Sequence, residues 1–335
     1  MKVLSLFDGM SCGQIALKQL GVILDVYYAS EIDKYAISQT QLNFPDTVQL
    51  GDVTKWREWN IDWKSLDLIL AGSPCQGFSF AGKQLAFDDP RSKLFFVFID
   101  ILNHVRSFNP NVLFLLENVN MKKSYMRVIS EYCGVFPVNI NSNLVSAQNR
   151  NRWYWTNIRT KQVGLFGELH SDIPQPADKG ILLRDVLEEV VDEKYYVSQA
   201  VIDRMNKPHK CFTPQINPSK AGCLTTKNNS GQMSFDSGTT FISISLNKST
   251  PMGSAMGMGG GHVPMITSEE LQCKTDIRLR RLTPVECSRL QTIPFWYQWK
   301  CSDTQIYKML GNGWTVDVIA HILSFMNIDN NDIKN

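Results

Sequence analysis

Apolar residues in the first 160 positions occur as short, nearly continuous runs separated by segments with helical spacing. Such runs are typical of strands that are buried on both faces of a parallel sheet, and the intervening segments predict helices that cover it. The alternation predicts an α/β fold with a doubly wound, mostly parallel sheet. The expected strands are 3–6, 24–28, 66–70, 112–116 and 135–140, and the expected helices are 14–20 and 94–105.

The pattern changes after about residue 180. From 201 to 250 six basic residues stand against two acidic ones, a local excess of +4. The segment 252–261 holds five glycines and three methionines in ten positions, which predicts a flexible loop. We therefore expect a second, smaller and irregular domain over 181–280.

Helical spacing returns towards the end of the chain. Thr283 and Pro284, with Glu286 in the capping-box position, predict a helix that runs to Leu290. The segment 306–326 has helical spacing and is expected to return to the first domain. The first domain then consists of 1–180 plus 303–335, and 281–302 forms a hinge region between the two domains.

Composition narrows the class of protein. With 34 Lys and Arg against 32 Asp and Glu, the net charge of +2 argues against a polycation, although a local basic face would suffice for a nucleic-acid enzyme. The longest apolar run, Leu94 to Ile99, is too short to cross a membrane, and no signal-peptide core follows Met1. We expect a cytoplasmic protein. The eight cysteines form no close pairs and the five histidines show no ligand spacing, so we expect no metal.

Polar residues follow the expected strands, at the edge where parallel sheets bind ligands. Gly9 and Gly13, after the first strand, allow backbone to approach a ligand. Glu31 is placed to accept from ribose hydroxyls, and Asp52 could accept from an adenine amino group. These residues indicate a nucleoside-containing cofactor, and the missing third glycine disfavours NAD. The alternative is a plain strand–helix turn with surface acids.

Three further segments carry candidate chemistry. Cys75 follows an expected strand between glycine turns and is a candidate nucleophile, against the alternative of a buried structural thiol. Glu117 ends a buried strand, where a carboxyl can hold or release a proton near neutral pH, or simply cap the next helix. Arg150 and Arg152 point to the same side if they lie on a strand. One could pair with a substrate carbonyl and the other with a phosphate or Glu117, unless the pair is only a solvated basic edge.

In this order the segments resemble the DNA (cytosine-5) methyltransferase family. The chain is similar to the de novo DNA methyltransferases of this family at Asp8, Trp314 and 145–147. The segment 76–82 instead looks like that of bacterial members, which suggests a bacterial or phage enzyme. Ser11 and Cys12 stand where the family usually has a second glycine. The matching motifs are Phe7-x-Gly9, Pro74-Cys75-Gln76, Glu117-Asn118-Val119, Gln148-x-Arg150-x-Arg152, Arg281 to Gln291, and Gly311-Asn312-Gly313.

The resemblance implies methyl transfer from S-adenosyl-L-methionine to carbon 5 of cytosine in double-stranded DNA, on a base flipped out of the helix. Cys75 would add to carbon 6, Glu117 would hold the N3 edge, Arg152 would pair with O2, and Arg150 would support the Cys75 loop or a phosphate. The first domain would bind the cofactor, and the second would recognise the target. The implied cofactor contacts are Phe7, Asp8, Gly9, Gly13, Glu31, Ile32, Asp52, Pro74, Leu94, Asn312 and Trp314.

DNA contacts are expected from two places, the loop after Cys75 and the second domain. The candidates are Ser79, Lys83, Arg91, Thr225, Thr226, Lys227 and Asn228, which suit phosphates or base edges. A cognate restriction endonuclease is a further partner that the resemblance implies. Two other functions stay open: an RNA (tRNA) cytosine-5 methyltransferase, and a catalytically silent regulatory homologue.

Overall fold

The structure, a computed structural model, describes residues 1–73, 93–200, 202, 215–226, 239–245 and 277–327. Its main element is a seven-stranded sheet in the order β3-β2-β1-β4-β5-β7-β6. All neighbouring pairs are parallel except those of β7, which runs against both β5 and β6. The expected doubly wound, mostly parallel sheet is confirmed. Its strands are β1 (Lys2–Leu6), β2 (Val26–Ser30), β3 (Val48–Gln49), β4 (Leu68–Ala71), β5 (Leu113–Val119), β6 (Val138–Asn141) and β7 (Asn151–Thr156).

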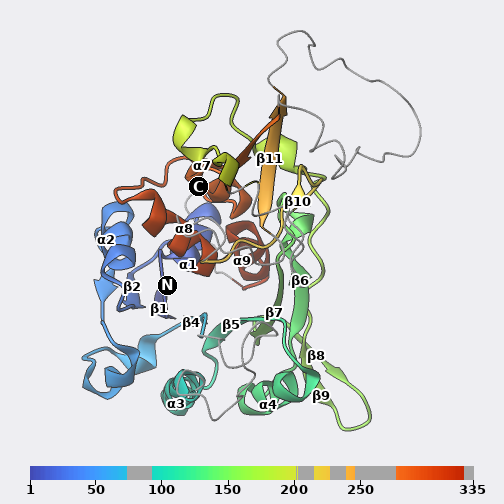
Figure 1. The fold of residues 1–335 in the computed structure, drawn as a ribbon. Coiled ribbons are helices and arrows are strands. Elements are labelled where there is room, and N and C mark those ends of the chain that lie inside the picture. Colours follow the sequence, from blue (N-terminus) through green and yellow to red (C-terminus); the bar gives the residue numbers. More distant parts are fainter. Residues whose placement is uncertain (74–92, 201, 203–214, 227–238, 246–276, 328–335) are drawn as a thin grey trace.

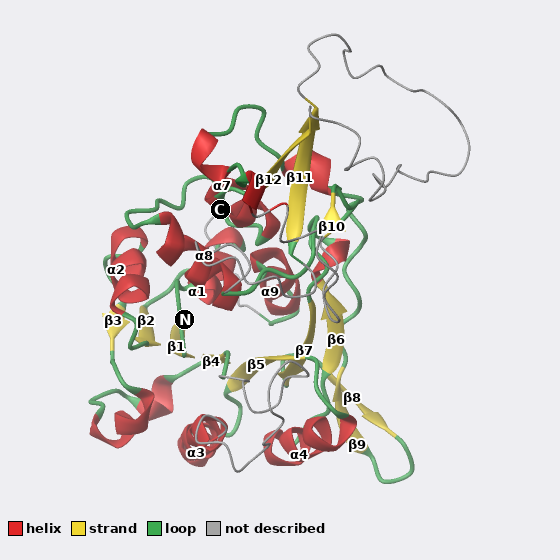
Figure 2. Ribbon diagram, viewed as in Figure 1, coloured by secondary structure: helices red, strands yellow, loops and turns green. Residues whose placement is uncertain are grey.

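Successive residues of the central strands enter two apolar cores, one on each face of the sheet. Leu68 and Leu70 belong to one core, and Ile69 and Ala71 belong to the other, as the alternation of side chains along a strand requires. Helices α1, α8 and α9 cover the first face, and α3 and α4 cover the second (Figures 1 and 2). These helices are α1 (Cys12–Gln19), α3 (Lys93–Phe108), α4 (Lys123–Cys133), α8 (Asp303–Asn312) and α9 (Val316–Leu323), with α2 (Lys34–Asn43) and α7 (Pro284–Leu290) beside them.

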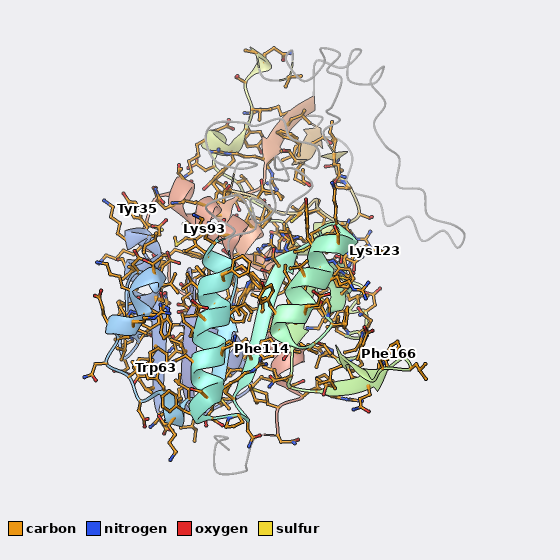
Figure 3. The ribbon with its side chains drawn as sticks, turned by 90° about the horizontal axis from the view of Figure 1, so that it is seen from below. Tyr35, Trp63, Lys93, Phe114, Lys123 and Phe166 are labelled. Carbon is orange, nitrogen blue, oxygen red and sulfur yellow. The ribbon has the colours of Figure 1, made fainter. Side chains whose placement is uncertain are left out.

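Seen from the second face, α3 and α4 lie side by side, with Lys93 and Lys123 at their N-terminal ends (Figure 3). Phe95, Phe98 and Leu102 form the buried stripe of α3. Their spacing of three and four residues explains why this run folds as a helix although it is nearly all apolar at its start. No helix among the described residues is long and apolar enough to cross a membrane.

The C-terminal elements follow the sequence closely. Thr283 caps α7: its hydroxyl accepts from the Glu286 backbone N–H at 3.1 Å, and the Glu286 carboxylate accepts from the Thr283 N–H at 2.8 Å. The predicted capping box is confirmed. The segment 306–326 folds as two helices with a break at Gly313, and α9 packs against α1, as expected for a segment that returns to the first domain.

The described part of 181–280 shares a core with the helices of the first face. Leu183, Ala221, Leu224 and Ile242 are buried in the same apolar cluster as α7 and α8. Residues 252–261 lie outside the described residues, so the expected loop is not tested. The remaining strands are β8 (Thr160–Val163) and β9 (Glu168–Ser171), which form a hairpin, and β10 (Gln215–Ile216), β11 (Thr240–Ser245) and β12 (Ile277–Arg281), which form a small sheet.

Candidate active site

A cavity of about 530 Å³ opens at the carboxyl ends of β1, β2, β4 and β5. Its wall also includes the end of α8 and the start of β7, which are distant in sequence. Gly13 does not line it: a Cβ there would lie 2.4 Å from Leu70 Cδ1, so this glycine serves the packing of α1 on the sheet. Pro74 lies outside the described residues. The other predicted cofactor residues line the cavity: Phe7, Asp8, Gly9, Glu31, Ile32, Asp52, Leu94, Asn312 and Trp314.

The loop after β1 follows a left-handed path. Phe7, Gly9 and Ser11 have φ angles of 58°, 60° and 61°. Such angles are rare for residues with a side chain and cost of order 1–3 kcal/mol each. Ser11 adopts a left-handed conformation that glycine takes without a steric cost, and its hydroxyl donates to the Asp8 carboxylate. This hydrogen bond stabilises the turn.

Asp8 and Glu31 hold this loop from opposite sides. Asp8 accepts from the Tyr27 hydroxyl at 2.8 Å, and burial raises the pKa of Asp8 to about 6. Glu31 accepts from the backbone N–H groups of Gly9 at 2.8 Å, and of Ile32 and Asp33 at 2.7 and 2.8 Å. A carboxylate offers about four lone-pair positions. Three are used here, which leaves Glu31 able to accept from one further hydroxyl.

Asp52 stands at the next strand end along the sheet. Its Oδ1 accepts from both the backbone N–H and the hydroxyl of Thr54, at 2.9 and 2.8 Å. These hydrogen bonds lower the pKa of Asp52 below its usual range, so the group is ionised at neutral pH. Both described bonds go to the same oxygen. Asp52 can therefore accept from an amino group of a ligand, as its position in the sequence predicts.

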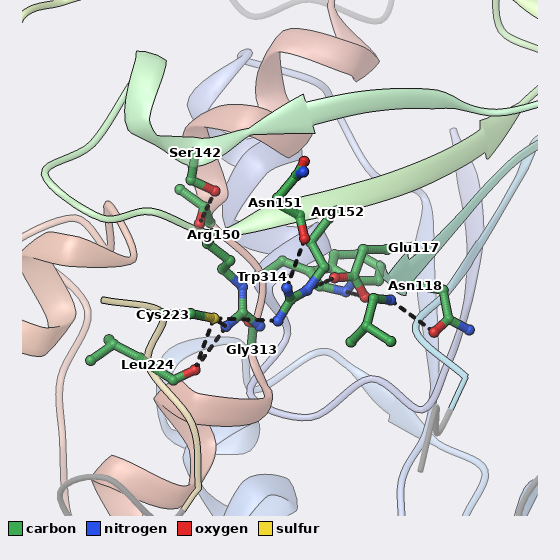
Figure 4. A network of polar contacts seen from close by, with 12 residues as sticks. Glu117, Asn118, Ser142, Arg150, Asn151, Arg152, Cys223, Leu224, Gly313 and Trp314 are labelled. Carbon is green, nitrogen blue, oxygen red and sulfur yellow. Dashed lines mark hydrogen bonds and ion pairs between the residues drawn. The ribbon is translucent and has the colours of Figure 1, made fainter. Parts of the chain in front are cut away.

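Glu117 and Arg152 both line the cavity and lie against each other (Figure 4). The Arg152 Nε lies 3.0 Å from Glu117 Oε1, close enough for an ion pair although its N–H is not aligned to donate a hydrogen bond. Trp314 Nε1 donates to Glu117 Oε2 at 3.2 Å. The two charged side chains are only 11% and 14% exposed, so water screens the pair weakly. The predicted partnership of an arginine with Glu117 is present.

Arg150 has a different environment from the one expected. It is 3% exposed and donates to the Leu224 carbonyl at 3.0 Å and the Gly313 carbonyl at 2.8 Å. A guanidinium with these partners does not reach a DNA phosphate, because its N–H groups are used and covered. Arg150 therefore joins the 221–226 segment to the end of α8, and the expectation of a phosphate partner is corrected. The two arginines do point to the same side, since both contact Cys223.

The structure describes some of the catalytic and DNA-contact candidates, and the others lie outside the described residues. Thr225 and Thr226 line the cavity, where their backbone passes Gly311 so closely that a Cβ on that glycine would lie 2.5 Å from it. Ser73, which accepts from Asn118 Nδ2 at 3.3 Å, also lines the cavity, two residues before Cys75. Cys75, Ser79, Lys83, Arg91, Lys227 and Asn228 lie outside the described residues.

Two residues of the site were not predicted from the sequence. Lys308 on α8 pairs with Asp33 at 2.5 Å across the mouth of the cavity, and helical spacing alone gives no sign of this contact. Cys223 has its sulfur 3.4 Å from Arg150 Nη1 and 3.5 Å from Arg152 Nη2. Its neighbours Thr225 and Thr226 were candidates for DNA contact, but nothing in the local sequence singled out Cys223 itself. No group of three or more metal-binding side chains occurs among the residues that the structure describes.

Comparisons with known proteins agree with this architecture. Residues 1–327 match the sequence profile of C-5 cytosine-specific DNA methylases. The chain is 30% identical to the type II methyltransferase M1.ScrFI of Lactococcus lactis subsp. cremoris, over 97% of this chain and 77% of that protein. It is 28% identical to the type II methyltransferase M.HhaI of Haemophilus parahaemolyticus, over 96% and 93%. The solved S. pombe Dnmt2 methyltransferase has the same fold, with a TM-score of 0.66 at 20% identity and 97% coverage of both chains.

The seven-stranded sheet, with its antiparallel β7, thus has the fold of a solved methyltransferase. The chain belongs to the C-5 cytosine-specific DNA methylase family, as its motifs predicted. It is an enzyme of that class.

Proposed function

We propose that this enzyme transfers the methyl group of S-adenosyl-L-methionine to carbon 5 of a cytosine that is flipped out of double-stranded DNA. The observation that carries the proposal is the Glu117–Arg152 pair, which shares one cavity with Glu31 and Asp52. A nucleoside-binding wall thus faces a wall with an acid and a cation suited to a pyrimidine edge.

The cofactor side fits the adenosine part of S-adenosyl-L-methionine. Glu31 has acceptor capacity left for a ribose hydroxyl, and ionised Asp52 can accept from the adenine amino group. Ile32 is 76% exposed and offers an apolar surface to the adenine ring. When bound, the sulfonium supplies an electrophilic methyl group.

The base side fits cytosine. Glu117 in its protonated form would donate to N3, so that negative charge does not accumulate on the ring when a nucleophile adds. Arg152 lies beside Glu117 and would donate to O2. Trp314 fixes the other oxygen of Glu117 and so sets the plane of the carboxyl group.

The reaction needs a nucleophile at carbon 6, and the family motif assigns this role to Cys75. Its thiolate would form the S–C6 bond, which makes carbon 5 electron-rich. Carbon 5 would then take the methyl group that bound S-adenosyl-L-methionine supplies, with the thioether as the leaving group. Loss of the carbon 5 proton to a base and of the Cys75 thiolate restores the aromatic ring. Flipping the base costs a few kcal/mol of stacking and pairing.

We also propose that 1–180 with 303–335 acts as the catalytic domain, and that 181–280 recognises the target, with 281–302 as the hinge. Thr225 and Thr226 support this division, because they reach the cavity from the second region. Relatives include proteins named type II methyltransferases and a phage protein named an orphan methyltransferase. A cognate restriction endonuclease is therefore a proposed partner, which copurification with the products of neighbouring genes would test.

The proposal is tested by sequencing 5-methylcytosine at single-base resolution in DNA from a methylation-free bacterial host that expresses the chain. Methylation should appear in the host's DNA and vanish with Cys75→Ser. Purified enzyme should also be trapped on DNA that contains 5-fluorocytosine, because only an attacking nucleophile forms the stable adduct. Methylated tRNA with unmodified DNA would favour an RNA substrate, and the absence of trapping on either nucleic acid would favour a silent homologue.

A further inference from the structure

The buried charges around Glu117 do not balance with the residues that the mechanism uses. Arg150 and Arg152 bring two guanidinium groups into the same cluster, and Glu117 brings one carboxylate. Arg150 is 3% exposed, and the Arg152 side chain is 14% exposed. An unpaired charge at such burial is costly, because water no longer solvates it. The cluster therefore has room for one more anion.

Cys223 is the group placed to supply that anion. Its sulfur accepts from Arg150 Nη1 at 3.4 Å and from Arg152 Nη2 at 3.5 Å, so it lies between the two cations (Figure 4). Sulfur–nitrogen distances of this size are hydrogen bonds for the larger sulfur atom. When protonated, the thiol can instead donate to the Leu224 carbonyl at 3.5 Å, an oxygen that Arg150 already occupies.

No other titratable group described around the arginines takes this role. Tyr154 on β7 and Cys12 on α1 are both buried, which raises the pKa of Tyr154 well above its usual range and that of Cys12 to about 12. Both are neutral near neutral pH. For Cys223, burial opposes ionisation, but the two arginines outweigh it and lower the pKa of the thiol below its ordinary value.

We propose that Cys223 is a positioning residue that works as a thiolate: it bridges Arg150 and Arg152 and so holds Arg152 against Glu117. The role deepens the proposed function, on which it rests, because Arg152 and Glu117 are the groups assigned to the cytosine edge. It also connects the two regions of the enzyme. Cys223 comes from the target-recognition region, so the base-binding pair is held in place only when that segment is docked.

The ionisation can be measured without catalysis. The full-length enzyme is alkylated with iodoacetamide over a range of pH, and each cysteine is followed by peptide mass spectrometry. Cys301 is the internal control, because it is also partly exposed and burial raises the pKa of its thiol. We expect the midpoint for Cys223 to lie below neutral pH and below that for Cys301. A midpoint for Cys223 above neutral pH, or equal to that for Cys301, overturns the proposal, and so does failure of Cys223 to react while Cys301 reacts.

The positioning role is tested by two substitutions, one neutral and one negatively charged. Cys223→Ser keeps a small polar side chain without an anion, and we expect kcat to fall about tenfold to a hundredfold, with KM for the cofactor unchanged. Cys223→Asp restores an anion and should recover most of kcat, with the acidic limb of the pH–rate profile moved to lower pH. Cys301→Ser should behave as wild type.

The outcomes separate this inference from the proposed function. If wild type methylates DNA and Cys223→Ser matches it in kcat and pH profile, the positioning role is wrong and the proposed function stands. If wild type neither methylates nor is trapped by 5-fluorocytosine, the proposed function fails, while the alkylation midpoints still decide whether Cys223 is a thiolate.

Discussion

The two walls of the cavity are built in different ways. Most of the proposed cofactor wall comes from consecutive strand–helix units within residues 7–52, to which Leu94, Asn312 and Trp314 are added from later in the chain. Its acids are held by backbone N–H groups and hydroxyls a few positions away or on the adjacent strand. The base wall is assembled from β5, β7, the 221–226 segment and the end of α8, and buried charges hold it together. Local structure thus supports most of the proposed cofactor site, whereas long-range contacts support the proposed base site. Damage to the base wall should therefore impair catalysis while cofactor binding survives.

Glu117→Gln should give the largest difference between the effect on catalysis and the effect on cofactor binding. The amide can keep the Trp314 hydrogen bond, but it cannot carry the charge that pairs with Arg152 in the resting enzyme, nor take up the proton that Glu117 would donate to N3 in the reaction. We expect kcat to fall by about 10²–10⁴, with the dissociation constant for S-adenosyl-L-methionine nearly unchanged. Single-turnover kinetics and isothermal titration calorimetry measure the two quantities. Loss of cofactor binding with normal kcat would show that Glu117 belongs to the other wall.

Gly311→Ala should push the 221–226 segment away from the end of α8. The new Cβ would lie 2.5 Å from the backbone of Thr225 and Thr226, which cannot move as a flexible side chain would. We expect a loss of roughly a hundredfold in kcat, again with the cofactor bound normally.

Gly134→Ala is the matched control for this change. Gly134 has a φ of 76° at the end of α4 and open space around its Cα, so alanine there should cost about 1 kcal/mol of stability. Activity should be unaffected. Equal loss in both variants would point to general destabilisation and not to the contact with Thr225.

On the cofactor wall, Asp8 should make stability depend on pH. Burial raises its pKa to about 6 in the folded protein, whereas an exposed aspartate titrates near 4. The folded state therefore binds the proton more strongly, and this contribution to stability, about 3 kcal/mol, is present below pH ~4 and is lost as pH rises through ~6. Asp8→Asn should remove this dependence in urea unfolding between pH 4 and 7, whereas exposed Asp46→Asn should retain it. An unchanged slope in Asp8→Asn would contradict the assignment.

The smallest effect is expected from Asp52→Asn. Asparagine still caps the following 3-10 turn, so the change removes mainly the charge that Thr54 stabilises. We expect KM for S-adenosyl-L-methionine to rise about tenfold with kcat unchanged, as for the loss of one charge-assisted hydrogen bond. Steady-state kinetics at saturating DNA measure this, with Asp46→Asn as the charge control. A change in kcat alone would place Asp52 outside the cofactor wall.

The same division explains how far the sequence could predict the molecule. Five strands of the seven-stranded sheet, the α7 cap and the strand-end positions of Glu31 and Asp52 could be predicted, because apolar runs, capping residues and strand ends are local signals. The short β3 and the antiparallel β7 were not expected. Arg150 could not be assigned its partners, since the carbonyls of Leu224 and Gly313 are more than seventy positions away. Cys223 carried no local signal for the same reason. The charge balance of a buried cluster depends on distances in the folded protein, and the spacing of residues in the sequence does not give these distances.

The position of Trp314 has a consequence for the newly made protein. Chains emerge from the ribosome with the N-terminus first, and early segments begin to fold before later ones exist. The acids Glu31 and Asp52 are both present in the chain by residue 52, but Glu117 receives its tryptophan from position 314. A nascent chain can therefore form this part of its cavity long before Glu117 has its hydrogen-bond partner.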